Sequence, residues 1–293
     1  MQHPTTLYVS DLDGTLLDST SRISPASTDI LNRAMDCGAL FTVATARTPG
    51  TLGMLLRDLH MRLPAIVMTG VTLWQRDGSV YSDTCYLHPD TVGRLRTIYE
   101  EAGLPYFIYT LQDGKIYVYH HGPLSQVERG FIAERCHSPY KTFLIDADGN
   151  SDIPQRVENG LLMFAMRPEE VVYPALGRLQ EVEGINLMCY RDATLPDTTM
   201  LEVFPGDATK ALAIRRLASR VGADRIVVYG DNRNDLSMFE IADLAVAVGN
   251  AIPEVREKAD VVIAHHDCDA VARHIYEDFR QHLPADRRLL MEL

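Results

Sequence analysis

The sequence lacks long apolar runs and an excess of basic residues, and each absence excludes a class of partner. No run approaches the ~20 apolar residues that a membrane-spanning helix needs, so we expect no membrane partner. The 28 Lys and Arg residues are outnumbered by 40 Asp and Glu residues, which gives a formal net charge of −12 at pH 7. This acidic balance argues against binding to nucleic acid or to anionic membranes.

The sequence also has few cysteines, and its start lacks a basic segment followed by an apolar core, the pattern of a signal peptide. The five cysteines are dispersed and odd in number, and none form a C-x-x-C pair. Such usage fits a reducing compartment better than a disulfide framework. We therefore expect a cytoplasmic protein, a monomer or a small homo-oligomer, whose cysteines are packing residues.

The 293 residues, 46% hydrophobic and 23% charged, suffice for one large or two ordinary globular domains. Near the start, apolar runs at residues 7–11, 40–45 and 65–70 read as strands. Segments 24–38 and 48–59 between them read as helices, because each begins at a capping residue followed by proline. Strands that alternate with helices predict a Rossmann-like parallel sheet covered on both faces.

The pattern changes from about residue 74, where closely spaced strands predict an antiparallel-rich α+β segment. Helices are expected there at about 89–102 and 168–182. The strand–helix alternation then returns and continues to the end of the chain. The predicted organisation is therefore an α/β core split by an inserted α+β domain, with the core at 1–82 and 192–293 and the insert at 83–191.

The stretch "YVSDLDGTLLDS" ends an apolar strand with Asp11 and Asp13. Side chains at i and i+2 of an extended segment project to the same side, so these carboxylates lie close together. Two close carboxylates repel each other unless a proton or a cation lies between them. The pair by itself could equally be a capped turn or the metal-nucleotide site of a glycosyltransferase.

Further polar residues follow other core strands, at the sheet edge where open α/β sheets bind ligands. They are Thr45 and Arg47, Lys210, and Asp231, Asn234 and Asp235. Carboxylate oxygens without nearby His or Cys favour Mg²⁺ over zinc. A lysine and a hydroxyl suit a phosphoryl group, and the cation would let carboxylates approach that anion.

The motifs "DLDGTLLDS", "TVATAR", Thr209-Lys210 and "GDNRNDLSMFEIADLAVAVGNAIPEVREKAD" together resemble the haloacid dehalogenase-like (HAD-like) phosphatases. More narrowly they resemble the Cof-type branch (type IIB, C2-capped), which inserts a cap after the third core strand. The motifs occur in the family's order. The resemblance implies a HAD-like core and an inserted α+β cap that sets substrate specificity.

The resemblance also implies a role for each motif residue. Asp11 would be the nucleophile that forms an aspartyl-phosphate, and Asp13 the general acid and then the general base. Mg²⁺ would be bound by Asp11, the backbone carbonyl of Asp13, Asp231 and Asp235. The implied phosphate-binding residues are Thr45, Ala46, Lys210 and Asn234, and Arg47 and Asn250 are secondary substrate contacts.

Two positions depart from the family's pattern. The second motif usually reads T-G-R, whereas this chain has Ala46, which disfavours a positive φ. After the third strand the family tends to read N-G-A, whereas this chain reads Thr69-Gly70-Val71. Because of the second departure, the substrates of the family are a weaker guide to the substrate of this chain.

These features predict a Mg²⁺-dependent phosphatase that acts on a small phosphorylated metabolite, such as a sugar phosphate or a phosphorylated cofactor. The alternatives are a phosphosugar mutase of the same superfamily and a catalytically idle metabolite-binding or receiver-like module. A signalling receiver domain is short and carries its phosphorylated Asp in mid-chain, so Asp13 and the long insert disfavour it.

Two histidine pairs, His120-His121 and His265-His266, also suggest metal binding. Adjacent residues of a strand point to opposite faces, so each pair would be a poor chelate. We expect all four to be surface or cap histidines.

Overall fold

The computed structural model describes residues 4–192, 195 and 197–283. The chain forms two compact units, Met1–Asp83 with Thr209–Leu293 and, between them in sequence, Thr84–Ala208. The second unit ends later than the predicted boundary at residue 191. The reason is that strand β11 (Thr199–Pro205) pairs with strands of the second unit's sheet.

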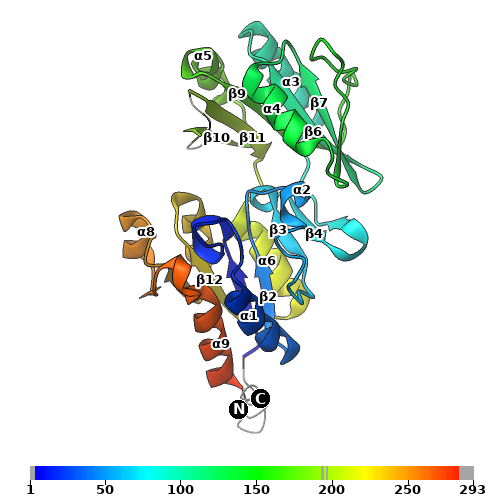
Figure 1. Ribbon diagram of the computed structural model, residues 1–293. Coiled ribbons are helices and arrows are strands. Elements are labelled where there is room, and N and C mark those ends of the chain that lie inside the picture. Colours follow the sequence, from blue (N-terminus) through cyan, green and yellow to red (C-terminus); the bar gives the residue numbers. More distant parts are fainter. Residues whose placement is uncertain (1–3, 193–194, 196, 284–293) are drawn as a thin grey trace. The chain divides into compact units, whose positions relative to one another are not determined.

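The first unit is built on a five-stranded sheet in the order β14-β13-β12-β1-β2 (Figure 1). All neighbouring strands in it are parallel, as the strand–helix alternation predicted. The strands are β1 (Thr6–Ser10), β2 (Leu40–Val43), β12 (Arg225–Gly230), β13 (Leu244–Ala247) and β14 (Val261–Val262).

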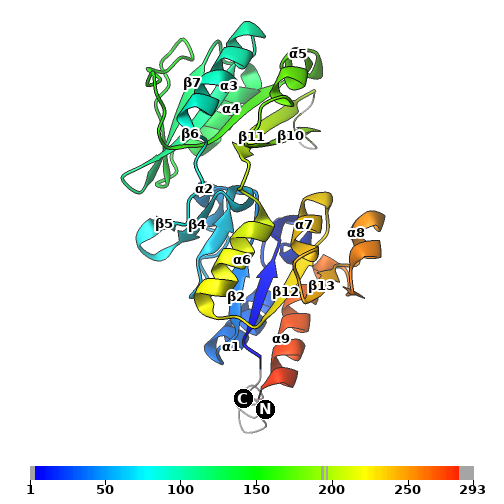
Figure 2. The same cartoon turned by 180° about the vertical axis from the view of Figure 1, so that it is seen from behind.

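Helices cover both faces of this sheet, α1 and α9 on one face and α6 on the other (Figures 1 and 2). Helix α1 begins where predicted, because the Ser24 hydroxyl accepts a hydrogen bond from the Ser27 N–H. The helix predicted over 48–59 is α-helical only at its start and continues as turns. The helices are α1 (Pro25–Asp36), α2 (Pro49–Leu52), α6 (Lys210–Val221), α7 (Leu236–Phe239), α8 (Pro253–Lys258) and α9 (Ala270–His282).

Strands β3 (Ala65–Val67), β4 (Thr72–Gln75) and β5 (Val80–Ser82) form a small antiparallel sheet in the first unit. The third predicted strand stops early because residues 68–70 all have positive φ. Gly70 is required there, since a Cβ at this position would overlap the backbone carbonyl of Thr209. This close approach fixes the segment beside the start of helix α6.

The second unit contains a six-stranded sheet in the order β10-β11-β9-β6-β7-β8, antiparallel except for the β7–β8 pair. Helices α3 (Pro89–Glu101) and α5 (Glu169–Leu179) match the helices predicted at 89–102 and 168–182. Helix α4 (Gln126–Arg135), which the sequence did not suggest, packs Phe131 against Phe107 and Phe164. The remaining strands are β6 (Tyr106–Gln112), β7 (Lys115–His121), β8 (Lys141–Phe143), β9 (Gly160–Arg167) and β10 (Ile185–Arg191).

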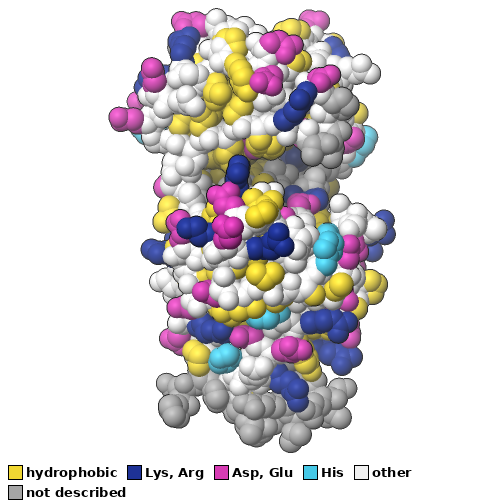
Figure 3. Space-filling view, turned by 90° about the vertical axis from the view of Figure 1, so that its left-hand side faces the viewer, with side chains coloured by type: hydrophobic (Ala, Val, Ile, Leu, Met, Phe, Trp, Pro, Cys, Tyr) yellow, Lys and Arg dark blue, Asp and Glu magenta, His cyan; other side chains and the backbone are white. Residues whose placement is uncertain are grey.

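The distribution of charged side chains on the surface is consistent with a composition that contains both acidic and basic residues. On the face shown in Figure 3, acidic and basic side chains of the described residues lie intermixed. None of the described helices is both long and apolar enough to cross a bilayer. Cys85 is buried, as expected of a packing residue, whereas Cys136 and Cys268 are exposed, so that expectation was wrong for these two.

Candidate active site

A buried lysine joins two of the predicted carboxylates. Asp11 follows the last residue of β1, and Lys210 is the first residue of α6. The Lys210 Nζ lies 2.6 Å from Asp11 Oδ1 and 2.8 Å from Asp235 Oδ1. The lysine is held in place because the hydroxyl of Thr209 caps α6 by accepting a hydrogen bond from the Leu212 N–H.

The charge states of this buried trio, Asp11, Lys210 and Asp235, follow from its burial and its internal contacts. Burial raises the pKa of Asp11 to about 7, although the ammonium of Lys210 opposes the shift. Burial alone would lower the pKa of Lys210, but the two carboxylates outweigh it and raise that pKa. The lysine therefore stays charged and compensates the negative charge of the site.

The loop after β12 carries the other two acidic residues. Asp235 Oδ2 accepts hydrogen bonds from the backbone N–H groups of Asp231 and Asn232, at 3.0 and 3.1 Å. Asp231 Oδ1 accepts from the hydroxyl of Thr15 at 2.9 Å. Burial raises the pKa of Asp231 to about 6, and the Thr15 hydrogen bond acts against this. Both carboxylates are thus oriented by neighbouring donors.

The acidic cluster has the chemistry of a Mg²⁺ site. One carboxylate oxygen each from Asp11, Asp231 and Asp235 lies within 4.8 Å of the others. Opposite ligands of one Mg²⁺ lie about 4.2 Å apart, so small movements would suffice. No described residue donates a hydrogen bond to Asp11 Oδ2 or Asp231 Oδ2, whereas both oxygens of Asp235 are engaged. The free oxygens of Asp11 and Asp231 are therefore the best placed ligands.

Gly14 keeps the backbone close to this cluster. It has a φ of +77°, and a Cβ on it would lie 2.6 Å from Asp231 Oδ2. Any other residue would fill the space beside that oxygen. The glycine of the D-x-D-G-T motif thus preserves room at the carboxylate that is most available to a cation.

Asp13 and Arg47, predicted as separate contacts, form an ion pair. The guanidinium donates two hydrogen bonds to the carboxylate, at 2.8 and 2.5 Å. The hydrogen bond from Arg47 to Asp13 raises the pKa of the arginine. The Asp13 side chain is 54% exposed, so this second carboxylate faces solvent rather than the buried trio. Spacing in sequence gave no signal for this pairing.

Thr45 and Ala46 follow β2 at the same sheet edge. The Thr45 hydroxyl is buried and accepts a hydrogen bond from the Arg47 backbone N–H at 3.1 Å. Ala46 is exposed and is not among the residues with positive φ, so the departure from T-G-R introduces no backbone strain. This turn therefore tolerates alanine where a more flexible residue was expected.

The two predicted asparagines differ in their surroundings. Asn234 is exposed in the loop that carries Asp235. Asn250 donates a hydrogen bond from Nδ2 to the carbonyl of Gly14 at 2.7 Å, and its Oδ1 accepts one from the His266 N–H. Asn250 therefore holds the loop that follows Asp11 and Asp13.

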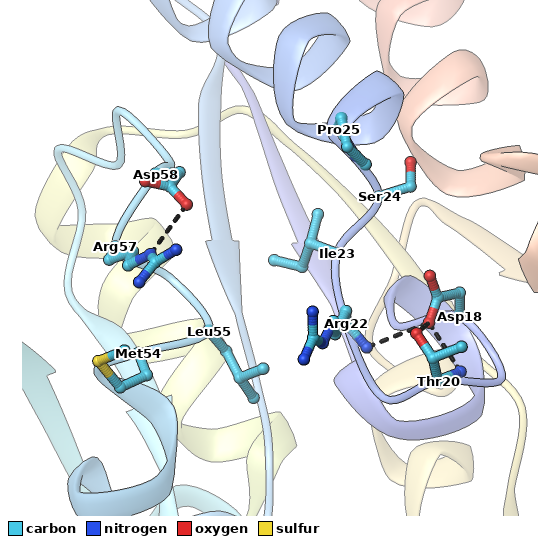
Figure 4. A pocket seen from close by; sticks show the side chains of 10 residues that line it. All are labelled: Asp18, Thr20, Arg22, Ile23, Ser24, Pro25, Met54, Leu55, Arg57 and Asp58. Atoms are coloured by element: carbon cyan, nitrogen blue, oxygen red, sulfur yellow. Dashed lines mark hydrogen bonds and ion pairs between the residues drawn. The ribbon is translucent and has the colours of Figure 1, made fainter.

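A pocket of about 610 Å³ in the first unit does not include the residues of the acidic cluster. It is lined by residues between 18 and 25 and between 54 and 58 (Figure 4). Asp18 accepts hydrogen bonds there from Thr20 and from the Arg22 backbone, and Arg57 pairs with its neighbour Asp58. None of the predicted site residues lines the pocket, so the acidic cluster remains the candidate active site.

The burial of Asp11 has a consequence for stability that can be measured. Its pKa rises from 3.8 unfolded to about 7 folded, so between these values the folded state retains a proton that the unfolded state has lost. Stability of the metal-free protein is therefore expected to fall as pH rises through this window. Urea unfolding in EDTA measures this fall. Between the two pH values, the free energy of unfolding is expected to decrease by at least about 1 kcal/mol more for wild type than for Asp11→Asn. Parallel pH profiles of the two proteins would contradict the raised pKa.

A family model described as haloacid dehalogenase-like hydrolase matches residues 8–275 of the chain. The chain belongs to the haloacid dehalogenase-like hydrolases. The membership predicted from the motifs is thus confirmed, as is the parallel-sheet core with an added α+β unit.

Individual relatives are similar over nearly the whole chain. The 5-amino-6-(5-phospho-D-ribitylamino)uracil phosphatase YwtE of Bacillus subtilis is 28% identical, over 89% of this chain and 94% of its own length. The pyridoxal phosphate phosphatase YbhA of Escherichia coli is 24% identical, over 93% and 98%. A crystal structure of a haloacid dehalogenase-like hydrolase from Bacteroides thetaiotaomicron has a TM-score of 0.73 at 23% identity, covering 93% of this chain and 99% of that one.

Proposed function

We propose that this hydrolase is a Mg²⁺-dependent phosphatase that releases phosphate from a small phosphorylated metabolite through an aspartyl-phosphate on Asp11. The contact of Asp11 Oδ1 with the buried ammonium of Lys210, beside the free oxygens of Asp11 and Asp231, carries the proposal. A buried carboxylate that is oriented and charge-compensated in this way suits nucleophilic attack on a phosphate ester.

In the first step, a carboxylate oxygen of Asp11 forms a bond to phosphorus while the bond from phosphorus to the ester oxygen breaks. Asp13 in its acid form gives its proton to the leaving oxygen, which departs as an alcohol. Lys210 stays next to Asp11 and offsets negative charge on the transferring phosphoryl group.

In the second step, Asp13, now a carboxylate, takes a proton from water. The resulting hydroxide attacks phosphorus, and the bond from phosphorus to Asp11 breaks. Inorganic phosphate leaves, Asp11 is again a carboxylate and Asp13 again carries its proton. The two steps balance without any oxidant or further reactant.

The chain's own residues suit the implied metal. Asp11 and Asp231 would hold Mg²⁺ through their free oxygens, while Asp235 would orient Lys210 and the loop that carries Asp231. Bound Mg²⁺ would supply positive charge that lets an anionic substrate approach the carboxylates and that disperses charge in the transition state.

The Asp13–Arg47 pair adds a condition to this scheme. Asp13 can transfer a proton only when its carboxylate is released by the guanidinium. An incoming phosphate ester offers Arg47 another bidentate anion. Substrate binding is therefore proposed to draw Arg47 from Asp13 and to free the general acid.

The substrate is proposed to be a small phosphorylated metabolite, either a sugar phosphate or a phosphorylated cofactor. Two relatives are named for phosphorylated ribitylaminouracil and for pyridoxal phosphate, which are compounds of this size. The second unit (Thr84–Ala208) is proposed to be the cap that distinguishes leaving groups.

The test is phosphate release from a panel of sugar phosphates, nucleotides and phosphorylated cofactors, with Mg²⁺ and with excess EDTA. Turnover is expected to require Mg²⁺ and to differ among panel members by at least about tenfold. A generic aryl phosphate serves as the positive control for the chemistry. Failure of folded, Mg²⁺-loaded protein to hydrolyse any of these compounds would contradict the proposal.

A further inference from the structure

The second histidine pair does not have the geometry that the sequence suggested. His120 and His121 lie on strand β7, where one is buried and the other exposed, as expected of strand neighbours. His265 and His266 instead lie at the start of a short 3₁₀ turn, His266–Cys268. Their ring centroids are only 4.6 Å apart. The two rings of this pair are therefore not directed to opposite faces as strand neighbours would be.

We propose that His265, His266 and Asp267 form a binding site for a transition-metal ion of the Zn²⁺ class, separate from the acidic cluster. One ligand atom from each residue lies within 4.8 Å of the others. His265 Nδ1 is 3.4 Å from Asp267 Oδ2. Adjacent ligands of a tetrahedral ion with bonds of 2.0–2.1 Å lie about 3.3 Å apart, so two donors already have the required spacing.

His266 is held in the form that binds a metal. Its Nδ1 lies 2.6 Å from the backbone carbonyl of Leu17. A carbonyl only accepts, so Nδ1 is the donor, and in the neutral imidazole Nε2 then carries the lone pair. Histidines that ligate metals commonly donate their other ring N–H to a carbonyl in this way, because it fixes the ring orientation and raises ligand basicity.

Asp267 is oriented by Ser19, outside the cluster. Its carboxylate accepts hydrogen bonds from the Ser19 N–H at 2.8 Å and from the Ser19 hydroxyl at 2.6 Å. Both hydrogen bonds fix the orientation of this carboxylate beside the two imidazoles. A bound ion would replace the long 3.3 Å hydrogen bond from the Asp267 N–H to His265 Nδ1.

The donor set distinguishes this site from the acidic cluster. Two imidazoles and one carboxylate favour Zn²⁺ and its neighbours in the first transition row, whereas carboxylates alone favour Mg²⁺. The side chains of His265 and Asp267 are 49% and 41% exposed, so an ion can enter and keep water in a fourth position. The proposal does not depend on the phosphatase activity.

The test is calorimetric titration of the full chain with Zn²⁺ in an excess of Mg²⁺, which occupies the acidic cluster. Wild type is expected to bind one Zn²⁺. His265→Gln is expected to weaken this binding at least about tenfold, and so is Asp267→Asn, which keeps the shape and one hydrogen-bonding oxygen. His121→Gln, an exposed histidine of the other pair, is the matched control and is expected to bind as wild type does.

Two further readouts keep the test decisive. Circular dichroism checks that each variant is folded, and Co²⁺ in place of Zn²⁺ reports the ligands by its visible spectrum. Cys268→Ser is expected to leave binding and spectrum unchanged, because the thiol is not part of the cluster. Absence of Zn²⁺ binding by wild type, equal binding by wild type and His265→Gln, or loss of binding only in Cys268→Ser would each overturn the proposal.

Discussion

Replacing Asp11 with Asn is expected to reduce phosphate release by at least about 10³-fold, while the protein stays folded. The amide keeps the shape of the carboxylate but cannot supply the electron pair that attacks phosphorus. Lys210 retains its second partner, Asp235, so its charge remains compensated. The loss is therefore expected in kcat rather than in folding, and steady-state phosphate release in excess Mg²⁺ measures it.

A matched control distinguishes loss of the proposed nucleophile from a general loss of negative charge. Asp29, exposed on helix α1, pairs with Arg33 one helical turn away. Asp29→Asn is expected to retain wild-type kcat and KM, because surface pairs of this kind contribute little. Residual activity of Asp11→Asn near that of the control would place the nucleophile elsewhere and would contradict the proposed chemistry.

The cluster of carboxylates at the candidate site was predictable because topology, rather than detailed packing, brings these residues together. Asp11 and Asp231 follow parallel neighbours, β1 and β12, and the carboxyl ends of parallel strands meet at one sheet edge. Lys210 was predictable for a similar reason, since it begins the helix that returns from that edge. For these residues, the alternation of strands and helices in the sequence was enough to predict that they lie at one edge of the sheet.

Contacts that depend on side-chain direction were not predictable in the same way. The Asp13–Arg47 pair needs two loops to place a carboxylate and a guanidinium face to face, and no periodicity encodes that. The sequence likewise gave no signal for the hydrogen bond from Asn250 to the Gly14 carbonyl. His265 and His266 lie in a turn rather than in a strand, so the alternation of side chains along a strand does not apply to them.

The predicted boundaries were wrong where tertiary contacts override the local hydrophobic pattern of the sequence. The apolar run at 65–70 predicts one strand, but close packing against Thr209 converts its second half into a turn with positive φ. Strand β11 reads equally well as part of the core or of the insert, because its apolar pattern does not reveal its partner.

Replacing Lys210 with Met is expected to cost about 3–5 kcal/mol of stability in metal-free protein and to abolish turnover. Methionine has similar length and fills the buried space, so the change removes mainly the charge. Asp11 and Asp235 then face each other in a buried site without their shared cation. Urea unfolding in EDTA measures the cost, and Lys115→Met, at an exposed lysine of strand β7, is the control.

The double variant Asp11→Asn/Lys210→Met tests whether charge is the cause. It is expected to be at least about 1 kcal/mol more stable than Lys210→Met alone, because removing one carboxylate relieves the uncompensated pair. Excess Mg²⁺ is expected to stabilise Lys210→Met more than Asp11→Asn/Lys210→Met, since the divalent cation is proposed to bind the Asp11 carboxylate. If Lys210→Met unfolds at the same urea concentration as wild type, the lysine does not compensate these carboxylates. The electrostatic basis proposed for the site would then be wrong.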